Sequence, residues 1–461
     1  MNGLEETDLK KSRNTHLAKV SRRDFLKLSG LAAGSALLNA CAPSGSLVTQ
    51  SEQKKKIQLV YQDWRTEWFP AMAQQMLERF HQSHANIRVF YVPDPVDVEE
   101  SLLVDMQAGV APDVFAACCS FFPILAQEDQ TLDLRPFVEE ELDEETIDDW
   151  DPVQYKALFT RDGRQYGLPK YHGALALYYN KDYCDEYGVD YPDGSWDHDD
   201  YLEAMKRLTV DRDGDGEIDQ WGSILDISWD RIQMHVNGWG GHFVHPDDPK
   251  RSLLAEPEAL EAMEWIRARI WDDRVMASPL DVQNMGPLLA FATGKVAMAE
   301  DGSWALKDAL TRANFRIGVA PFPAGPVRRV TLATTDGFGI YKNTRYPGEC
   351  WELMKFLISR EYGRAMAETN FLQPARASLV EEWAGYIRDE FPEKARDIDI
   401  AAFADGHIKG YSVVAEVFAN MTESKRLIDA AWDKIFTLGQ EPVEIMKEVS
   451  RKVEEAQERV T

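Results

Sequence analysis

Basic residues are scarce in this sequence, and no long apolar run follows its N-terminal region. The 461 residues include 51 Lys and Arg against 78 Asp and Glu, which gives a formal net charge of −27. Nucleic-acid affinity comes mainly from cations that neutralise phosphates, so this deficit excludes a nucleic-acid-binding protein and an electrostatic hold on anionic lipid. Beyond residue 40, no stretch approaches the roughly 18 uncharged apolar residues of a membrane-spanning helix, so we expect that part to be soluble.

Apolar and aromatic residues are plentiful enough for sizeable cores. Hydrophobic residues make up 44% of the chain, and its length corresponds to two or three domains of typical size. The aromatic residues include 13 Trp, 16 Tyr and 20 Phe. A tryptophan ring either packs in a core or offers a flat apolar platform to a ligand, and its position along the chain has to distinguish the two.

The N-terminal region has the features of an export signal. Residues 21–27 read S-R-R-D-F-L-K, and a weakly apolar stretch continues to Ala40. Paired arginines before such a stretch are typical of a twin-arginine signal, here residues 1–40. The sequence Leu-Asn-Ala-Cys ending at Cys41 resembles a lipobox, so we expect Cys41 to be lipidated and residues 41–56 to form a flexible tether. The protein is then lipid-anchored at the outer face of the cytoplasmic membrane, or periplasmic, with the lipid as its only membrane attachment.

The other four cysteines leave their pairing open. They are Cys118, Cys119, Cys184 and Cys350. The adjacent pair could close a strained vicinal disulfide, but spacing alone does not decide this. Twin-arginine export carries chains folded in the reducing cytoplasm, so disulfides are not the expected source of stability.

The first part of the mature chain alternates strand and helix patterns. We predict strands at 57–61 and 86–92 and from 111 onward, with helices at 68–83 and 99–108. This order predicts an α/β domain with a largely parallel sheet, whose ligands sit at the carboxyl ends of the strands. The segments Asp63-Trp64 and Cys118-Cys119-Ser120 follow two of these strands, so we expect them to lie together.

Further along, residues 166–180 contain a continuous apolar strand, and Asp197 with two following acids predicts a helix start that runs to Leu208. Later helices are predicted at 257–271, 348–359, 360–369, 423–438 and 442–460.

Several short motifs occur in an order that is similar to one protein family. They are Gly167-Leu168-Pro169, Leu177–Asp182, Gly194-Ser195-Trp196, Asn237–Gly241, Phe291–Met298, Gly302-Ser303-Trp304 and Gln373–Arg376. Together, over residues 57–461, the chain resembles the extracellular solute-binding proteins of ABC importers, specifically the sugar-binding family that includes maltose-binding protein.

The resemblance implies an α/β fold of periplasmic-binding-protein type II, with two lobes joined by hinge crossovers and a ligand cleft between them. Lobe one would comprise residues 57–172 and 338–405, and lobe two residues 173–337 and 406–461. Closure of the lobes around ligand gives a transport partner a state to recognise. The implied function is that of a non-enzymatic subunit that binds a carbohydrate, in oligosaccharide form, and delivers it to an ABC permease with its ATPase subunits.

A sugar site needs aromatic planes for the C–H faces and carboxylates, amides or guanidinium groups for the hydroxyls. The resemblance places ten residues at the cleft: Asp63, Trp64, Ser120, Tyr171, His172, Trp239, Trp304, Asp336, Arg376 and Tyr411. Of these we expect Trp64, Trp239 and Trp304 to stack on the ligand. Hydrogen bonds are expected from Asp63, Ser120, Asp336 and Arg376. Core or hinge packing is the competing interpretation for each residue.

A second motif is independent of the cleft. Acids at positions 1, 3, 5 and 9 with Gly216 at position 6 match an EF-hand loop, in which oxygens surround a hard cation. The expected ligands are Asp211, Asp213, Asp215, Glu217 and Asp219. Position 12, normally Glu, is Gly222, so a structural Ca²⁺ would take its last carboxylate from elsewhere. The alternative is a solvated acidic turn.

Other chemistry has little support in the sequence. It contains no H-E-x-x-H, Cys-x-x-Cys, G-x-S-x-G or Walker motif. A glycoside hydrolase stays open only because the separation of two carboxylates is a three-dimensional property. A glycerophosphodiester or other non-sugar solute is the other alternative, although only Arg65, Lys170 and Arg376 supply cations near the inferred loops.

Overall fold

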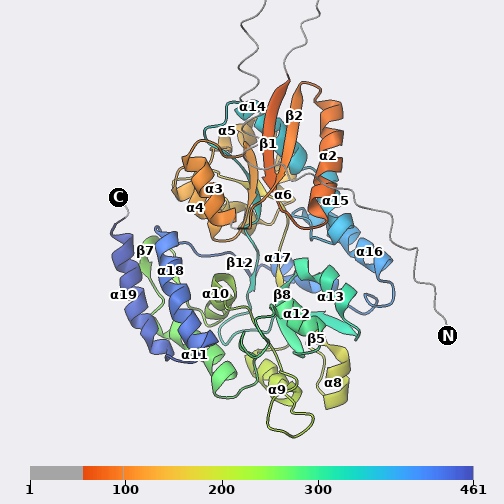
Figure 1. Ribbon diagram of the computed structural model, residues 1–461, viewed down its shortest axis with the longest axis vertical. Helices are drawn as coiled ribbons and strands as arrows, with labels where there is room; N and C mark the ends of the chain where they lie inside the picture. Colours follow the sequence, from red (N-terminus) through yellow and green to blue (C-terminus); the bar gives the residue numbers. More distant parts are fainter. Residues whose placement is uncertain (1–55, 97, 460–461) are drawn as a thin grey trace, which may run out of the picture. The chain divides into compact units, whose positions relative to one another are not determined.

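The computed structural model describes residues 56–96 and 98–459 (Figure 1). The predicted export signal, Cys41 and the tether as far as residue 55 lie outside the described residues. Within the described residues, none of the helices combines the length and the apolar character needed to cross a membrane.

The first lobe is built on a five-stranded sheet in the order β2-β1-β3-β11-β4. Its strands are β1 (Ile57–Asp63), β2 (Ile87–Pro93), β3 (Val114–Ala117), β4 (Leu168–Pro169) and β11 (Gly337–Ile340). The strand β1 lies between β2 and β3 and is parallel to both, as predicted for the strands at 57–61, 86–92 and from 111 onward. The late strand β11 inserts antiparallel between β3 and β4, so a segment far along the chain completes this sheet.

Helices from residues 69–157 and from residues 347–370 cover the first sheet (Figure 1). They are α2 (Phe69–Ser83), α3 (Val98–Gln107), α4 (Phe121–Gln127), α5 (Arg135–Glu141), α6 (Glu144–Asp148), α7 (Pro152–Ala157), α14 (Pro347–Leu357) and α15 (Arg360–Asn370). The helix α2 buries Phe69, Met76 and Phe80, the same apolar stripe that predicted it. These side chains share one core with Trp351 of α14, so burial of apolar surface joins the N-terminal and late segments.

The second lobe contains an antiparallel sheet in the order β8-β5-β9. Its strands are β5 (Leu175–Asn180), β8 (Met298–Gly302) and β9 (Ile317–Ala320). Every residue of β5 is buried, which explains its continuous apolar pattern. Two short ladders complete the lobe: β6 (Val244–His245) with β7 (Asp248–Ser252), and β10 (Thr331–Leu332) with β12 (Ser412–Val413).

The helices of the second lobe pack in two groups around this sheet. They are α8 (Lys181–Tyr187), α9 (His198–Leu208), α10 (Trp229–Gly238), α11 (Pro257–Trp271), α12 (Pro287–Ala292), α13 (Leu306–Arg312), α16 (Val380–Glu390), α17 (Asp405–Lys409), α18 (Met421–Trp432) and α19 (Met446–Gln457). One group, with α9, α10, α11, α18 and α19, surrounds Trp432. The other, with α12, α13 and α16, lies over Tyr178 of β5.

The boundary near residue 405 differs from the expected one. We expected lobe one to continue from residue 338 to residue 405. The structure instead packs Trp383, Ile387 and Phe403 in the same core as Tyr178 of the second sheet. The chain thus returns to the second lobe before α16, because Trp383 of α16 packs on Phe403, and Phe403 packs on Tyr178 of β5.

Extended segments near residues 173, 334 and 373 run side by side where the lobes meet. The amide of Thr334 donates to the carbonyl of Gly173 (2.7 Å), and the amide of His172 donates to the carbonyl of Gln373 (3.0 Å). The side-chain amide of Gln154 donates to the carbonyls of Tyr171 and Thr334 (2.8 and 2.7 Å), which ties two of the segments to α7. These crossings hold the two lobes next to each other.

Candidate functional site

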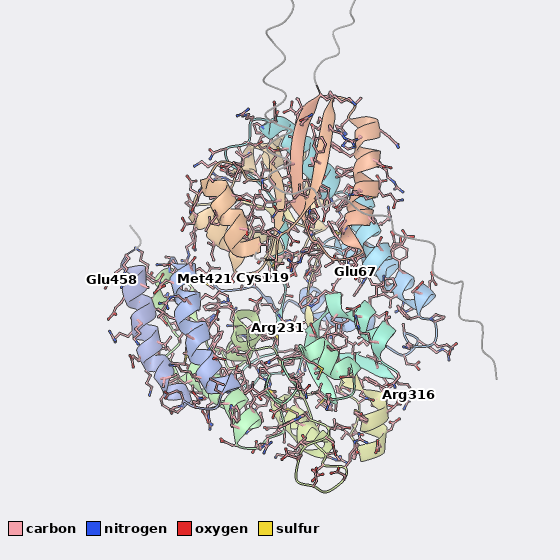
Figure 2. All side chains as sticks on the ribbon, in the orientation of Figure 1. Glu67, Cys119, Arg231, Arg316, Met421 and Glu458 are labelled. Atoms are coloured by element: carbon pink, nitrogen blue, oxygen red, sulfur yellow. The ribbon has the colours of Figure 1, made fainter. Side chains whose placement is uncertain are left out.

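A cavity of about 610 Å³ lies where the two lobes meet, and both lobes line it. Its size is within the range of ligand pockets, about 300–1,000 Å³. Figure 2 places Cys119 and Glu67 on the first-lobe side and Arg231 on the second-lobe side of this junction. The lining residues used below are Trp64, Glu67, Trp68, Cys118, Cys119, Tyr171, Asp230, Arg231, Trp304, Lys307, Asp308, Arg312 and Asp336.

The first-lobe wall is aromatic and follows the end of β1. The rings of Trp64 and Tyr171 meet edge to face, with centroids 5.3 Å apart. The ammonium of Lys170 lies 3.1 Å from the centroid of Trp64, on a ring face that is therefore closed to ligand. Lys170 is itself paired with Asp63, and both side chains are fully buried. A buried ion pair thus fixes the orientation of the Trp64 platform from beneath.

The second-lobe wall is formed by Trp304 and Arg231. The Trp304 ring lies so close to Gly302 and Gly173 that a Cβ on either would approach it to 2.2 and 2.9 Å, so side chains at these positions would displace it. The guanidinium of Arg231 lies 5.4 Å from the centroid of Trp304. A terminal nitrogen of Arg231 is 3.8 Å from Asp301 Oδ1. The ring and the cation are thus held together on one side of the cavity.

Two polar atoms beside this wall have no hydrogen-bond partner. The buried Oδ1 of Asp230 and Nε of Arg231 are unpaired. Burial raises the pKa of Asp230, and burial raises the pKa of Asp336, also in the cavity lining, to about 6. A buried polar atom without a partner is costly, so a group that supplies hydrogen bonds here would stabilise the protein. The chemistry of the cavity is that of a binding site for a ligand with polar edges and apolar faces.

Four of the residues predicted from sequence line this cavity: Trp64, Tyr171, Trp304 and Asp336. Three others lie near it but are buried in the protein. Asp63 is occupied by Lys170, Tyr61 and the amide of Trp64. Ser120 is buried at the N-terminal end of α4. His172 is buried on a crossing segment, and burial lowers its pKa to about 4.

The other three predicted residues lie away from the cavity. Trp239 packs in the second-lobe core, with its ring centroid 4.7 Å from that of His198. Arg376 lies over Trp150, donates to the carbonyl of Ile358 (3.0 Å) and is 3.4 Å from Asp149. The hydroxyl of Tyr411 donates to Asp405 (2.7 Å). Each of these side chains has partners within the protein, because its loop folds back on its own lobe.

The prediction missed the residues that α10 and α13 bring to the cavity. These are Asp230, Arg231, Lys307, Asp308 and Arg312. Ser228 precedes α10 as its N-terminal flanking residue, and Asp230 is the acid of its first turn, so a helix start was readable there. The local sequence does not indicate that the start of α10 lies next to the end of β3 in the other lobe.

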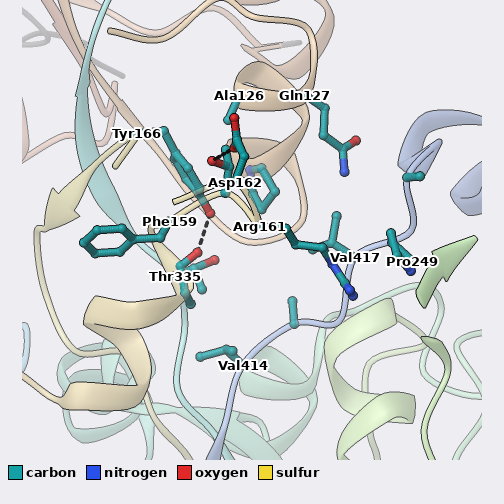
Figure 3. A pocket seen from close by; sticks show the side chains of 15 residues that line it. Ala126, Gln127, Phe159, Arg161, Asp162, Tyr166, Pro249, Thr335, Val414 and Val417 are labelled. Atoms are coloured by element: carbon teal, nitrogen blue, oxygen red, sulfur yellow. Dashed lines mark hydrogen bonds between the residues drawn. The ribbon is translucent and has the colours of Figure 1, made fainter. Parts of the chain in front are cut away.

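A second cavity, of about 730 Å³, lies on the other side of the crossing segment (Figure 3). Thr335 lines it, whereas Thr334 and Asp336 line the first cavity, because successive side chains of an extended segment point to opposite sides. Its other lining residues are mostly apolar and include Ala126, Phe159, Pro249, Val414 and Val417, with Arg161 among them. No unpaired buried polar atom of the described residues belongs to this lining. The first cavity is therefore the better candidate for a polar ligand.

The acidic loop after α9 has an ordered set of internal hydrogen bonds. Asp211 accepts from the amides of Gly214 and Gly216 (2.7 and 2.9 Å), and Gly216 has a φ of +91°, which favours glycine. Carboxylate oxygens of Asp211, Asp213 and Asp215 lie within 4.8 Å of one another. Among the described residues, Glu217 and Asp219 do not join this group; Asp219 instead accepts from the amide of Arg212 (2.7 Å).

Comparison with known proteins agrees with this architecture. Residues 63–364 match the family model described as bacterial extracellular solute-binding protein. A binding protein of Brucella abortus (strain 2308) is 27% identical over 284 residues, which are 57% of this chain and 63% of the relative. The match thus spans less than two thirds of that relative. An arabinooligosaccharide-binding protein of Halalkalibacterium halodurans is 37% identical over 120 residues, 25% of each chain.

A solved structure shows the same fold. The ABC substrate-binding protein Lmo0181 of Listeria monocytogenes, in complex with cycloalternan, aligns with a TM-score of 0.76 at 22% identity. The alignment covers 87% of this chain and 99% of that one. The two-lobe α/β fold expected from the sequence is confirmed. Because the family model covers more than half of the sequence, the chain belongs to the bacterial extracellular solute-binding protein family.

Proposed function

We propose that this protein is the extracytoplasmic substrate-binding subunit of an ABC importer, and that it binds a carbohydrate, in oligosaccharide form, in the cavity between the lobes. The observation that carries the proposal is the composition of that cavity. Trp64 and Trp304 offer aromatic surfaces from different lobes, and the unpaired Asp230 Oδ1 and Arg231 Nε offer an acceptor and a donor. A sugar presents C–H faces to the former and hydroxyls to the latter.

The charge of the cavity favours a neutral ligand. Arg231, Lys307 and Arg312 bring positive charge into the lining. They are offset by the acids of the same lining, which are Glu67, Asp230, Asp308 and Asp336. The ammonium of Lys307 is already engaged by the carbonyl of Thr369 (2.6 Å). The cavity therefore has no excess of cations for a phosphate group.

A glycerophosphodiester is the second candidate, and Arg231 is the residue that favours it. Its Nε lacks a partner and could donate to a phosphate oxygen. The nearby carboxylates Asp230 and Asp301 oppose this by repelling the same anion. The two candidates therefore differ in the charge that the cavity must accept.

The remaining parts of the proposal concern delivery. The family's role implies an ABC permease with its ATPase subunits as the partner. Export by the twin-arginine route and lipid attachment through Cys41 account for the motifs at residues 21–41. Labelling of the expressed protein with a radioactive fatty acid tests the anchor, with Cys41→Ala as the variant that should lose the label.

We also propose a structural Ca²⁺ ion in the loop of residues 211–219. The three clustered carboxylates and the glycine-permitted turn resemble the first half of an EF-hand loop, and oxygen ligands suit this hard cation. The ion would neutralise acids that otherwise repel one another on an exposed surface. It would have no part in ligand binding, because the loop supplies no residue to the cavity lining.

A binding screen tests the carbohydrate proposal. The full chain is heated in the presence of a panel of mono- and oligosaccharides and glycerophosphodiesters, and compounds that raise the melting temperature are titrated by calorimetry. We expect an oligosaccharide to bind and to be recovered uncleaved after incubation. Binding of glycerophosphodiesters alone would favour the second candidate, and cleavage of the sugar would indicate a glycoside hydrolase.

A further inference from the structure

Two adjacent cysteines, Cys118 and Cys119, lie at the carboxyl end of β3 and line the cavity. Cys119 has a φ of +57°, in the left-handed region that side-chain-bearing residues rarely adopt. Its conformation is held from the crossing segment, because the hydroxyl of Thr335 donates to the Cys119 carbonyl (3.0 Å). Strained residues of this kind concentrate at functional sites, so the pair is a place to look for chemistry.

The two side chains are thiols that interact with each other. The neighbouring Cys118 thiol, and then burial, raise the pKa of Cys119 well above its ordinary value. Within the described residues the remaining cysteines, Cys184 and Cys350, are buried in separate cores and do not line this cavity. Of the four cysteines in the described part of the chain, only the adjacent pair combines proximity of two thiols with access from the cavity.

The pair also faces the other lobe. The Cys119 thiol is within interaction range of Asp230, the buried acid on the first turn of α10. Asp230 is the residue whose Oδ1 has no hydrogen-bond partner and which we propose as a ligand contact. A change in the sulfur chemistry of Cys119 would therefore act on a carboxylate of the binding site and on a contact between the lobes.

We propose that Cys118 and Cys119 form a thiol–disulfide site that controls ligand binding in this cavity, an inference that rests on the proposed function. An external disulfide RSSR, low in molecular weight or carried by an oxidoreductase, is the oxidant. The Cys118 sulfur attacks one sulfur of RSSR and releases RSH, and the Cys119 sulfur then attacks Cys118 and releases the second RSH. The two thiol protons leave with the two released thiols, so the cysteines are oxidised and RSSR is reduced.

The covalent geometry makes such a bond easy to reverse. Adjacent Cα atoms are about 3.8 Å apart, closer than the roughly 4.4–6.8 Å of ordinary disulfides. A disulfide here is strained, and strained disulfides are the labile and regulatory ones. Ring closure removes the Cys119 S–H group that interacts with the Asp230 carboxyl group. The oxidised protein should therefore bind its ligand more weakly, and reduction should restore binding.

The test starts from the full chain, reduced with dithiothreitol and desalted, with half of it then exposed to glutathione disulfide. Mass spectrometry after alkylation with N-ethylmaleimide counts thiols, and calorimetry with maltotriose and arabinotriose measures affinity. We expect oxidation to remove about 2 Da from the peptide that holds both cysteines. Affinity for the sugar that the reduced chain binds should fall by about tenfold and recover after reduction.

Variants separate this site from other thiol effects. Whatever affinity each variant starts from, Cys118→Ser and Cys119→Ser should each show neither the mass loss nor the change of affinity on oxidation, whereas the matched double variant Cys184→Ser/Cys350→Ser should show both. A persistent glutathione adduct, an unchanged mass, or an unchanged affinity after ring closure would overturn the proposal. If the reduced chain binds neither sugar, both the proposed carbohydrate binding and its control by oxidation are contradicted for these two sugars. The mass measurement then tests only whether the two cysteines form a disulfide.

Discussion

Asp230 combines two properties that usually exclude each other in a stable protein. Asp230 is only 8% exposed, and its Oδ1 atom has no hydrogen-bond partner. Burial raises the pKa of this carboxyl group, because removing the charged form from water costs free energy. Such a cost is retained where a ligand offsets it, which makes Asp230 a better candidate than the fully paired Asp63 that the sequence suggested.

Replacement of this acid gives the first prediction. We expect Asp230→Asn to lower carbohydrate affinity by about tenfold, because a carboxyl acceptor for a hydroxyl is replaced by a weaker amide. The melting temperature should stay the same or rise, since the cost of burying an ionisable acid is removed. Calorimetry and thermal unfolding measure the two effects. Asp308→Asn is the matched control, because Asp308 lines the same cavity but is exposed; equal losses in both variants would argue against a specific role for Asp230.

Trp239 and Trp304 were both predicted to stack on the ligand, but we expect their replacement by alanine to have different effects. Trp239 is 9% exposed and packs in the second-lobe core. We expect Trp239→Ala to lower the free energy of unfolding by about 3–5 kcal/mol, with the affinity of the folded fraction nearly unchanged. Trp304→Ala should instead reduce affinity by about tenfold or more, since an aromatic platform is removed. Urea unfolding and calorimetry distinguish the two, and the reverse pattern would return Trp239 to the site.

At the level of elements, local signals located most helices and strands. The helix α11 spans Pro257–Trp271, as predicted, with proline in its first turn. Asp197 forms a capping box with Asp200 at the start of α9, the reciprocal pattern that its spacing predicts. The predicted helix over 423–438 is less regular: α18 ends at Trp432 and a π-helical turn follows over Asp433–Thr437. Periodicity identified this element, but its end depends on packing against α11 and α19.

The acidic loop is an element whose stability should depend on Ca²⁺. Binding to the folded state alone stabilises by about 2.7 kcal/mol at a hundredfold excess over the Kd, and each kcal/mol shifts the melting temperature of a lobe-sized unit by about 2–4 °C. We therefore expect added Ca²⁺ to raise the melting temperature by several degrees and a chelator to reverse the shift. Asp213→Asn should abolish the response, whereas the exposed Asp248→Asn should keep it. A melting temperature indifferent to both Ca²⁺ and chelator would refute the site.

For the whole molecule, buried histidines should make stability depend on pH. Burial lowers the pKa of His172 to about 4 and that of His198 to about 3. Between these values and the unfolded pKa near 6.5, the unfolded chain binds more protons, so stability falls as the pH falls through this range. The Asp151 carboxylate, which accepts a hydrogen bond from the His407 ring, raises the pKa of His407, whose contribution has the opposite sign and is lost as the pH rises through its folded pKa.

We expect each buried histidine to cost about 2 kcal/mol in the free energy of unfolding between pH 6.5 and pH 5. Urea unfolding at pH 7 and pH 5 measures this loss. His172→Gln should reduce it, because one of the two groups no longer titrates. His245→Gln is the control, since His245 is only partly buried. A loss that is as large in His172→Gln as in the unchanged protein would place the titration elsewhere.

Periodicity and caps in the sequence predicted most helices and strands, because these are local properties, and the resemblance carried by the motif order implied the two-lobe α/β fold. Trp64, Tyr171, Trp304 and Asp336, which the resemblance placed at the cleft, line the cavity, and their role in ligand binding stays a prediction. The partners of Trp239 and Arg376 within their own lobes, and the approach of the start of α10 to Cys119, became known from the folded structure alone. The reason is that a side chain's accessibility depends on which surfaces the packing of distant segments leaves uncovered, and that packing is not written in any single stretch of the chain.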